Sequence, residues 1–220
     1  GGAAAETRIR PDRNAAEIVV AARDRRGLFA DLALAISGLG GNVVGARVFT
    51  SAQGQALDVF HVQDITGAPI GSDNPRILRR LADALEAAGK GEAATFEPRK
   101  PQELGRAAAF SIVPTVMLDN DASEEATVVE ASGRDRPGLL EALARAVSEA
   151  GLSIVSAHID GYGERAVDAF YVQTPAGGKL TDAKASAALK QALMDVLDDG
   201  DTQPAGGRPR LERARASVAR

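Results

Sequence analysis

Hydrophobic positions along the first part of the chain alternate between strand-like and helix-like spacing. Glu17–Ala22 is a short and mostly apolar run, which predicts a strand, and the polar turn Arg23–Arg26 follows it. The next apolar residues are Leu28, Leu32, Ile36 and Leu39. Their spacing of four, four and three places them on one face of a helix, which the glycine pair Gly40-Gly41 ends.

The following segment predicts two more strands and a second helix. Asn42–Thr50 and Ala56–Ile65 are rich in strand-forming residues and are joined by a short turn with a glycine, as in a β-hairpin. Asn74-Pro75 predicts a helix start, since proline suits the first helical position, and this helix ends near Gly89. The unit is therefore β-α-β-β-α, and we expect Ser111–Asp119 to supply its closing strand.

The same order returns 111 positions later, because Arg134–Leu140 resembles Arg23–Phe29 and 134 − 23 = 111. After a one-residue deletion, Asp168–Gln173 resembles Asp58–Gln63. The second unit's elements are expected at Ala126–Ser132, Gly138–Ala150, Leu152–Asp160, Ala166–Thr174 and Asp182–Leu197. The sequence thus predicts an α+β fold of two ferredoxin-like βαββαβ units, with antiparallel sheets and helices on one face. Only Pro209–Leu211 and Val218 remain as weak candidates for a second closing strand.

This pattern divides the chain into four parts. We expect a flexible N-terminal segment at residues 1–14 and a first unit at 15–121, with a loop insert at 89–106. The second unit is expected at 122–200, and a flexible basic tail at 201–220.

Composition narrows the possible functions. Aromatic residues are 4% of the chain and tryptophan is absent, so the residues available suit two thin cores of Ala, Val, Leu and Ile. With 26 basic and 30 acidic residues the net charge is −4, which argues against a general nucleic-acid partner. Cysteine is absent and there are two histidines, which excludes a thiolate site or a histidine-rich metal centre.

Catalytic and targeting signals are not found in the sequence. It has no P-loop, no dinucleotide-binding fingerprint and no nucleophile elbow, and His61 and His158 stand apart from any metal motif. We therefore expect no catalytic residue, metal or cofactor in this chain. No apolar run is long enough to span a membrane and no signal peptide opens the chain, so a cytoplasmic protein without a membrane partner is expected.

The turn Arg-Asp-Arg-x-Gly-Leu occurs twice and suits a small zwitterion. Each copy joins a strand to a helix N-terminus, whose first N–H groups lack internal acceptors and favour a carboxylate. Gly27 and Gly138 let a ligand approach the backbone, and Asp24 and Asp135 can accept hydrogen bonds from an amino group. The structural alternative is that the aspartate caps the helix and the glycine eases a tight turn.

The second turn, with the predicted elements around it, resembles an ACT domain, a regulatory module that commonly binds amino acids. The tandem further resembles the C-terminal region of the bacterial protein-PII uridylyltransferase/uridylyl-removing enzymes, from about Ala15 to Leu197. The segments that carry this resemblance are Asp119–Ser123, Ala126–Glu130, Asp135–Leu140, Ala157–Asp160, Gly163–Arg165 and Asp168–Val172.

The resemblance implies a glutamine-sensing regulatory region in nitrogen metabolism. In that family, separate catalytic domains of the same polypeptide transfer uridylyl groups to the PII signal protein and remove them, and those domains are expected to use Mg. Their motifs are absent here, and the chain begins with Gly1-Gly2-Ala3 rather than Met, so a piece of a longer enzyme is expected.

Carried over to this sequence, the glutamine site has three parts. The first turn contributes Asp24, Arg25, Gly27 and Leu28. The second turn contributes Asp135, Arg136, Pro137, Gly138 and Leu139. Asn42 could supply an amide partner or could be an ordinary turn residue. The first turn departs from the family at Arg26, where the family usually has proline.

Two other interpretations of the sequence remain open. One is a free-standing tandem ACT regulator that acts by protein–protein contact, and the other is a nucleic-acid-binding ferredoxin-like domain. Strand alternation also places His61 with Gln63, and Tyr171 with Gln173, on one sheet face. That face is either a docking surface or an ordinary solvated face.

Overall fold

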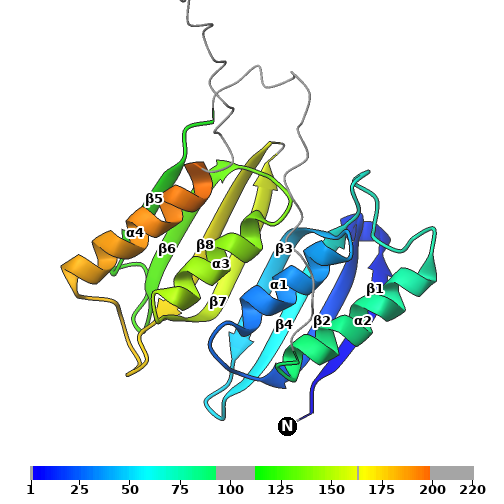
Figure 1. Cartoon of the computed structure of the whole chain (residues 1–220), viewed down its shortest axis with the longest axis horizontal. Coiled ribbons are helices and arrows are strands. Elements are labelled where there is room, and N and C mark those ends of the chain that lie inside the picture. The colour runs from blue at the N-terminus through cyan, green and yellow to red at the C-terminus, as the bar shows by residue number, and fades with distance from the viewer. Residues whose placement is uncertain (1, 93–111, 163, 199–220) are drawn as a thin grey trace, which may run out of the picture.

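The computed structural model describes residues 2–92, 112–162 and 164–198 and shows two ββαββα units in tandem (Figure 1). The first unit contains β1 (Ala4–Arg10), a 3₁₀ turn (Pro11–Arg13), β2 (Ala15–Arg23), α1 (Leu28–Gly38), β3 (Asn42–Thr50), β4 (Gln55–Gln63) and α2 (Pro75–Gly89). The second contains β5 (Thr115–Asp119), β6 (Thr127–Arg134), α3 (Leu139–Glu149), β7 (Ser153–Tyr162), β8 (Arg165–Gln173) and α4 (Ala183–Asp198).

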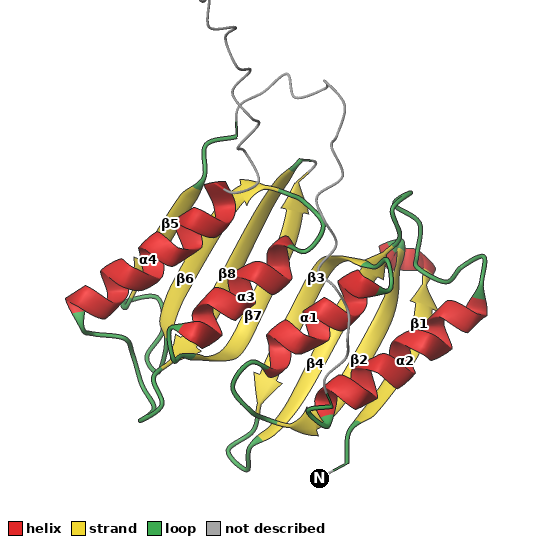
Figure 2. Ribbon diagram, viewed as in Figure 1, coloured by secondary structure: helices red, strands yellow, loops and turns green. Residues whose placement is uncertain are grey.

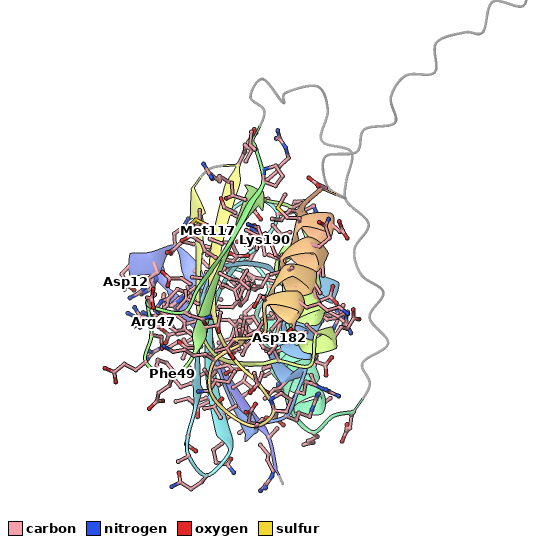
Figure 3. All side chains as sticks on the ribbon, turned by 90° about the vertical axis from the view of Figure 1, so that its left-hand side faces the viewer. Asp12, Arg47, Phe49, Met117, Asp182 and Lys190 are labelled. Atoms are coloured by element: carbon pink, nitrogen blue, oxygen red, sulfur yellow. The ribbon has the colours of Figure 1, made fainter. Side chains whose placement is uncertain are left out.

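All eight strands belong to one antiparallel sheet, in the order β1-β2-β4-β3-β7-β8-β6-β5. Helices α1, α2, α3 and α4 form a single layer on one face of it (Figure 2), and among the described residues no helix lies on the opposite face. Figure 3 shows the sheet nearly edge-on, with Arg47, Phe49 and Met117 on that opposite side and Lys190 of α4 on the helical side. The predicted α+β class, with ferredoxin-like antiparallel units and helices on one face, is confirmed.

The two units join through the antiparallel pair β3 and β7. The register of this junction places Arg47 opposite His158. Because 158 − 47 = 111, these residues are equivalents in the repeat. The strand order is also symmetric about this pair, so a pseudo-two-fold axis relates the units and passes between β3 and β7.

The expected flexible segment at residues 1–14 is wrong, because residues 4–10 form β1. β1 pairs with β2 from Ala4 opposite Ala21 to Arg10 opposite Ala15. The guanidinium of Arg10 also lies 3.3 Å from a carboxylate oxygen of the buried Glu17 on β2. Without β1, the outer edge of β2 would expose unpaired backbone groups, which explains why this polar segment is ordered.

The expected closing strand of the first unit is also wrong. Residues 115–119 form β5, which pairs with β6, so this segment belongs to the second unit and not to a first unit ending at 121. The edge it was assigned to is already occupied by β1, and a short loop from Asp119 to Thr127 suits a hairpin. In each unit the fourth strand therefore precedes the βαββα core instead of following it. Most of the predicted 89–106 insert, the 201–220 tail and the candidate strand around Leu211 lie outside the described residues.

The helices bury their apolar stripes against the sheet in one continuous core, instead of the two separate cores expected. Phe29 of α1 connects the units. Its ring stacks on Phe60 of its own unit at 5.6 Å between centroids and meets Phe170 of the second unit edge-on at 6.5 Å. Both rings on the strands are fully buried. Separating the units would expose this contact to water, which favours a fixed arrangement.

Removing β1 tests its role as a structural strand. We expect deletion of residues 2–10 to lower the free energy of unfolding by at least about 2 kcal/mol, the net worth of a few hydrogen bonds. The measurement is denaturant unfolding followed by circular dichroism. Glu6→Ala, at an exposed position of the same strand, is the control and should change stability little. A deletion as stable as the parent chain would contradict a structural β1.

Candidate functional site

Both Arg-Asp-Arg-x-Gly-Leu segments form the same tight turn. The backbone N–H of Leu28 donates to the carbonyl of Arg25 at 3.1 Å, and Gly27 has φ 82° and ψ −3°. These are the features of a type II turn with glycine at its third position, where φ must be positive. In the second unit Gly138 has φ 81° and ψ 0°. The glycine is therefore required by the backbone, and neither aspartate side chain caps its helix.

The arginine after the aspartate anchors each turn to the second helix of its unit. Arg25 donates to the carbonyl of Ala88 at 2.9 Å, in the last turn of α2, and to Asp31 at 2.7 Å. Arg136 donates to the carbonyl of Val196 in α4 at 2.8 Å. A cation at a helix C-terminus is electrostatically favourable and satisfies a free carbonyl. These contacts hold both turns rigidly beside the clefts described next.

Two clefts lie between the units and are related by the pseudo-two-fold axis. The Asp135 cleft has an empty volume of about 540 Å³, including its open mouth, and the Asp24 cleft about 380 Å³. Each is named for the aspartate of the turn that forms one wall. The other wall comes from the opposite unit, from the end of its first helix and the start of its next strand.

The residues of the two clefts correspond across the repeat. The Asp135 cleft is lined from the first unit by Ala33, Ser37, Gly41, Asn42, Val43 and Val44. The Asp24 cleft is lined from the second unit by Ala144, Ser148, Leu152, Ser153 and Ile154. Asn42 therefore faces the turn of the other unit, and Ser153 takes the equivalent place in the other cleft.

Each cleft includes a helix N-terminus with free donors. Leu140 and Glu141 line the Asp135 cleft, and Phe29 and Ala30 line the Asp24 cleft. Within the described part of the chain, the backbone N–H groups of these four residues have no recorded acceptor. Together with the helix dipole, they form a site that favours a carboxylate group.

A buried aspartate lies in each cleft, on the strand beneath the turn. Asp58 of β4 is 1% exposed and Asp168 of β8 is 2% exposed. Burial, with a smaller contribution from the charge of Asp24, raises the pKa of Asp58 to about 7. Burial raises the pKa of Asp168 to about 8, with added effects from Asp135 and Asp160. Each cleft therefore holds at least two carboxyl groups that compete for ionisation: Asp24 and Asp58 in one, and Asp135, Asp160 and Asp168 in the other.

The structure distributes most of the predicted site residues between the two clefts. Asp24, Arg25, Gly27 and Leu28 line one cleft. Asn42 lines the other with Asp135, Arg136, Gly138 and Leu139. Pro137 is not among the lining residues; it occupies the second position of its turn, which proline favours.

Asp58 and Asp168 were not among the predicted site residues, although the alternation along their strands contains the signal. Asp58 has the same parity as Phe60 and Val62, and all three point toward the helices. An acidic residue among core residues is uncommon, and its burial indicates a functional role. The equivalent residue of the second unit, Asp168, is buried in the same way.

The predicted polar face of the sheet holds mostly internal contacts. Gln63 donates to the carbonyl of Asn14 at 2.9 Å, and Gln173 donates to that of Glu125 at 3.1 Å. His61 lies 3.4 Å from the carboxylate of Glu17, and the ring of Tyr171 meets His158 edge-on. These side chains fasten strands and loops, as expected for an ordinary half-polar face.

Two further features are absent from the described residues. No cluster of three or more histidine, cysteine, aspartate or glutamate side chains there is arranged to hold a metal ion. No helix there is long and apolar enough to cross a lipid bilayer.

Comparison with known proteins gives clear relatives in sequence. The chain is 70% identical over 220 residues to the bifunctional uridylyltransferase/uridylyl-removing enzyme of Caulobacter vibrioides, covering 100% of this chain and 23% of that protein. The enzyme of the same name from Phenylobacterium zucineum is 66% identical over 221 residues, covering 100% and 24%. That of Azospirillum brasilense is 39% identical over 196 residues, covering 88% and 21%.

Other comparisons are weaker. No protein-family model matches the chain. Aspartate kinase from Synechocystis shares 22% identity and a TM-score of 0.45, over 83% of this chain and 27% of that one. The sequence relationship therefore rests on the bifunctional enzymes. It extends over the whole chain, which spans about 23% of their length.

The missing proline of the first turn can be tested by restoring it. We expect Arg26→Pro to raise the free energy of unfolding by about 0.4 to 1 kcal/mol, because proline presets the backbone angle of this position and reduces the freedom of the unfolded chain. The measurement is denaturant unfolding. Gly27→Ala is the matched opposite: it forces a side chain into positive φ, 3.3 Å from Ser148, and should destabilise the chain. A destabilising Arg26→Pro would contradict the assigned turn.

The buried aspartates predict an unusual pH dependence of stability. The folded pKa of Asp168 is raised, so between pH 4 and 8 the native state holds a proton that the unfolded chain has lost. The contribution of Asp168 to the free energy of unfolding therefore falls as pH rises through that range. We expect Asp168→Asn, a neutral near-isostere, to have a higher free energy of unfolding than the parent chain, by at least about 1 kcal/mol at pH 8 and by less at pH 5. Denaturant unfolding at each pH measures this difference. An equal difference at both pH values would contradict a raised pKa.

Proposed function

We propose that this chain is the C-terminal regulatory region of a bifunctional uridylyltransferase/uridylyl-removing enzyme and that it senses glutamine. The observation that carries the proposal is the pair of clefts between the units. Each combines free helix N–H groups, which suit an α-carboxylate, with carboxyl groups that suit an α-ammonium. That combination complements an amino acid rather than a simple anion or cation.

We favour glutamine over other amino acids as the ligand for two reasons, which are the family of the relatives and the amide side chain of Asn42. The names of the relatives describe a uridylyl transfer and its reversal, and the family that the sequence resembles is one whose regulatory region senses glutamine. Asn42 offers both a donor and an acceptor to a side-chain amide at the mouth of the Asp135 cleft. A carboxylate side chain would bring a further negative charge into a cleft that Asp135, Asp160 and Asp168 already line.

The proposed mechanism is a shift between two arrangements of the units. A ligand bound between them contacts both, so it stabilises the arrangement in which both walls fit it. Catalytic domains of the same polypeptide, outside this chain, would respond to that arrangement, and through them the PII signal protein would be the distant partner. Uridylyl transfer and Mg binding belong to those domains in this proposal, and the setting is the cytoplasm.

A double-mutant cycle tests the site across the units. In calorimetric titrations of the 220-residue chain with glutamine, we expect Asp135→Ala and Asn42→Ala each to weaken binding at one site. Their combined effect should differ from the sum by more than about 0.5 kcal/mol, because both residues face one ligand. Asp135→Ala combined with Ser153→Ala, which lies in the other cleft, should be additive.

Controls separate the ligand from the site. Glutamate replaces glutamine in a parallel titration and should bind more weakly. Asp83→Ala, on the exposed side of α2, should leave binding unchanged. The absence of heat and of a thermal shift at millimolar glutamine would contradict the proposed function.

A further inference from the structure

The two buried aspartates differ from every other buried acid in the described residues. Glu17 is paired with Arg8, Arg10 and His61, and Glu141 is paired with Arg145 at 2.6 Å. The Oδ1 atoms of Asp58 and Asp168 are buried and have no hydrogen-bond partner. A buried carboxyl group without a partner costs stability, so a purely structural role does not account for either.

The surroundings of Asp58 contain no cation aimed at it. Asp24 faces it from the turn between β2 and α1. Arg25 and Arg26 line the same cleft. One terminal nitrogen of Arg25 donates to Asp31 and to the end of α2, its buried Nε has no hydrogen-bond partner, and Arg26 is exposed. The opposite unit contributes only hydroxyl and apolar groups to this cleft.

The surroundings of Asp168 are more acidic still. Asp135 from the turn and Asp160 from β7 act on it, and Glu141 of α3 lines the same cleft while paired with Arg145. The remaining cation, Arg136, donates to the end of α4. Each cleft thus presents a buried, unpaired carboxyl group beside a second carboxylate, and a positive group small enough to enter is what both lack.

In both clefts the buried aspartate and the free N–H donors lie on different elements, so they can contact opposite ends of a ligand. Asp58 is opposite Val20 on β2 and Val48 on β3, and Asp168 is opposite Ala131 on β6 and Ile159 on β7. Both therefore lie on the helical face of the sheet, while the free N–H donors belong to the helix above. A zwitterion can satisfy both sets of groups at once, with its carboxylate at the helix and its ammonium at the strand.

We propose that Asp58 and Asp168 are the residues that bind the ammonium group of the ligand, one in each cleft, and that each releases a proton to solvent when the ligand binds. This rests on the proposed amino-acid site and identifies its ammonium-binding residues. Without ligand, burial and the neighbouring carboxylates favour the neutral acid. The incoming ammonium favours the carboxylate, so the acid proton passes to the buffer and the site keeps one ion pair.

The effect depends on pH in the same way in both clefts. The raised pKa values of Asp58 and Asp168 leave part of each population protonated at pH 7.5, and ligand binding releases those protons. Binding should therefore strengthen as pH rises from 6 to 8, since less work is needed to remove the proton.

The test is calorimetric titration of the full 220-residue chain with glutamine at pH 7.5 in two buffers, phosphate and Tris, whose ionisation enthalpies differ. We expect the apparent binding enthalpy to differ between the two buffers, because each released proton adds the ionisation enthalpy of the buffer that takes it up. Asp168→Asn should weaken binding at one site at least tenfold and remove most of the buffer difference, and Asp58→Asn should do the same at the other site. N-acetylglutamine, which lacks the ammonium group, should not bind.

Controls and alternative outcomes keep this inference distinct from the proposed function. Asp83→Asn should retain both affinity and buffer difference, and thermal unfolding checks that each variant is folded. Glutamine binding with equal enthalpy in both buffers and with unchanged affinity in Asp168→Asn would overturn the inference and leave the function standing. Proton release with another of the twenty amino acids, but not with glutamine, would overturn glutamine sensing and keep the inference. Binding of none of the twenty would overturn both.

Discussion

The antiparallel contact between β3 and β7 is the constraint on which the clefts depend. It joins Arg47 to its own repeat equivalent, His158, and thereby turns two similar units into one symmetric body. Each cleft takes one wall from a turn and the other wall from the opposite unit. A separated unit would hold half of each cleft, so any ligand that fills one is bound by the junction as much as by the turns.

In each turn, neighbouring residues have different roles. Gly27 and Gly138 supply the positive φ that lets the chain enter the helix abruptly. Arg25 and Arg136 fix the turn to the second helix of their unit. The aspartate between strand and arginine is left to face the cleft. Part of this motif therefore supports the turn, and only the remaining residues face the cleft.

Much of this arrangement could be predicted from patterns that act locally. The helix stripe from Leu28, the cap and proline at Asn74-Pro75, and the paired strands that follow α1 depend on neighbours within a few residues, and all of them are found. The role of residues 4–10 could not be predicted in this way. β1 is a polar strand that is stabilised by pairing with β2, and alternation alone does not reveal a strand whose faces are both partly exposed.

The sequence by itself determined the repeat, the fold class and the two turns, because each is encoded by residue types at short spacing. The tertiary structure decided which strand closes which unit, that Asn42 serves the opposite turn, and that Asp58 and Asp168 lie buried and unpaired beneath the clefts. The physical reason is that strand partners and burial depend on contacts between residues far apart in the chain. No local pattern specifies those contacts when two similar units compete for the same partners.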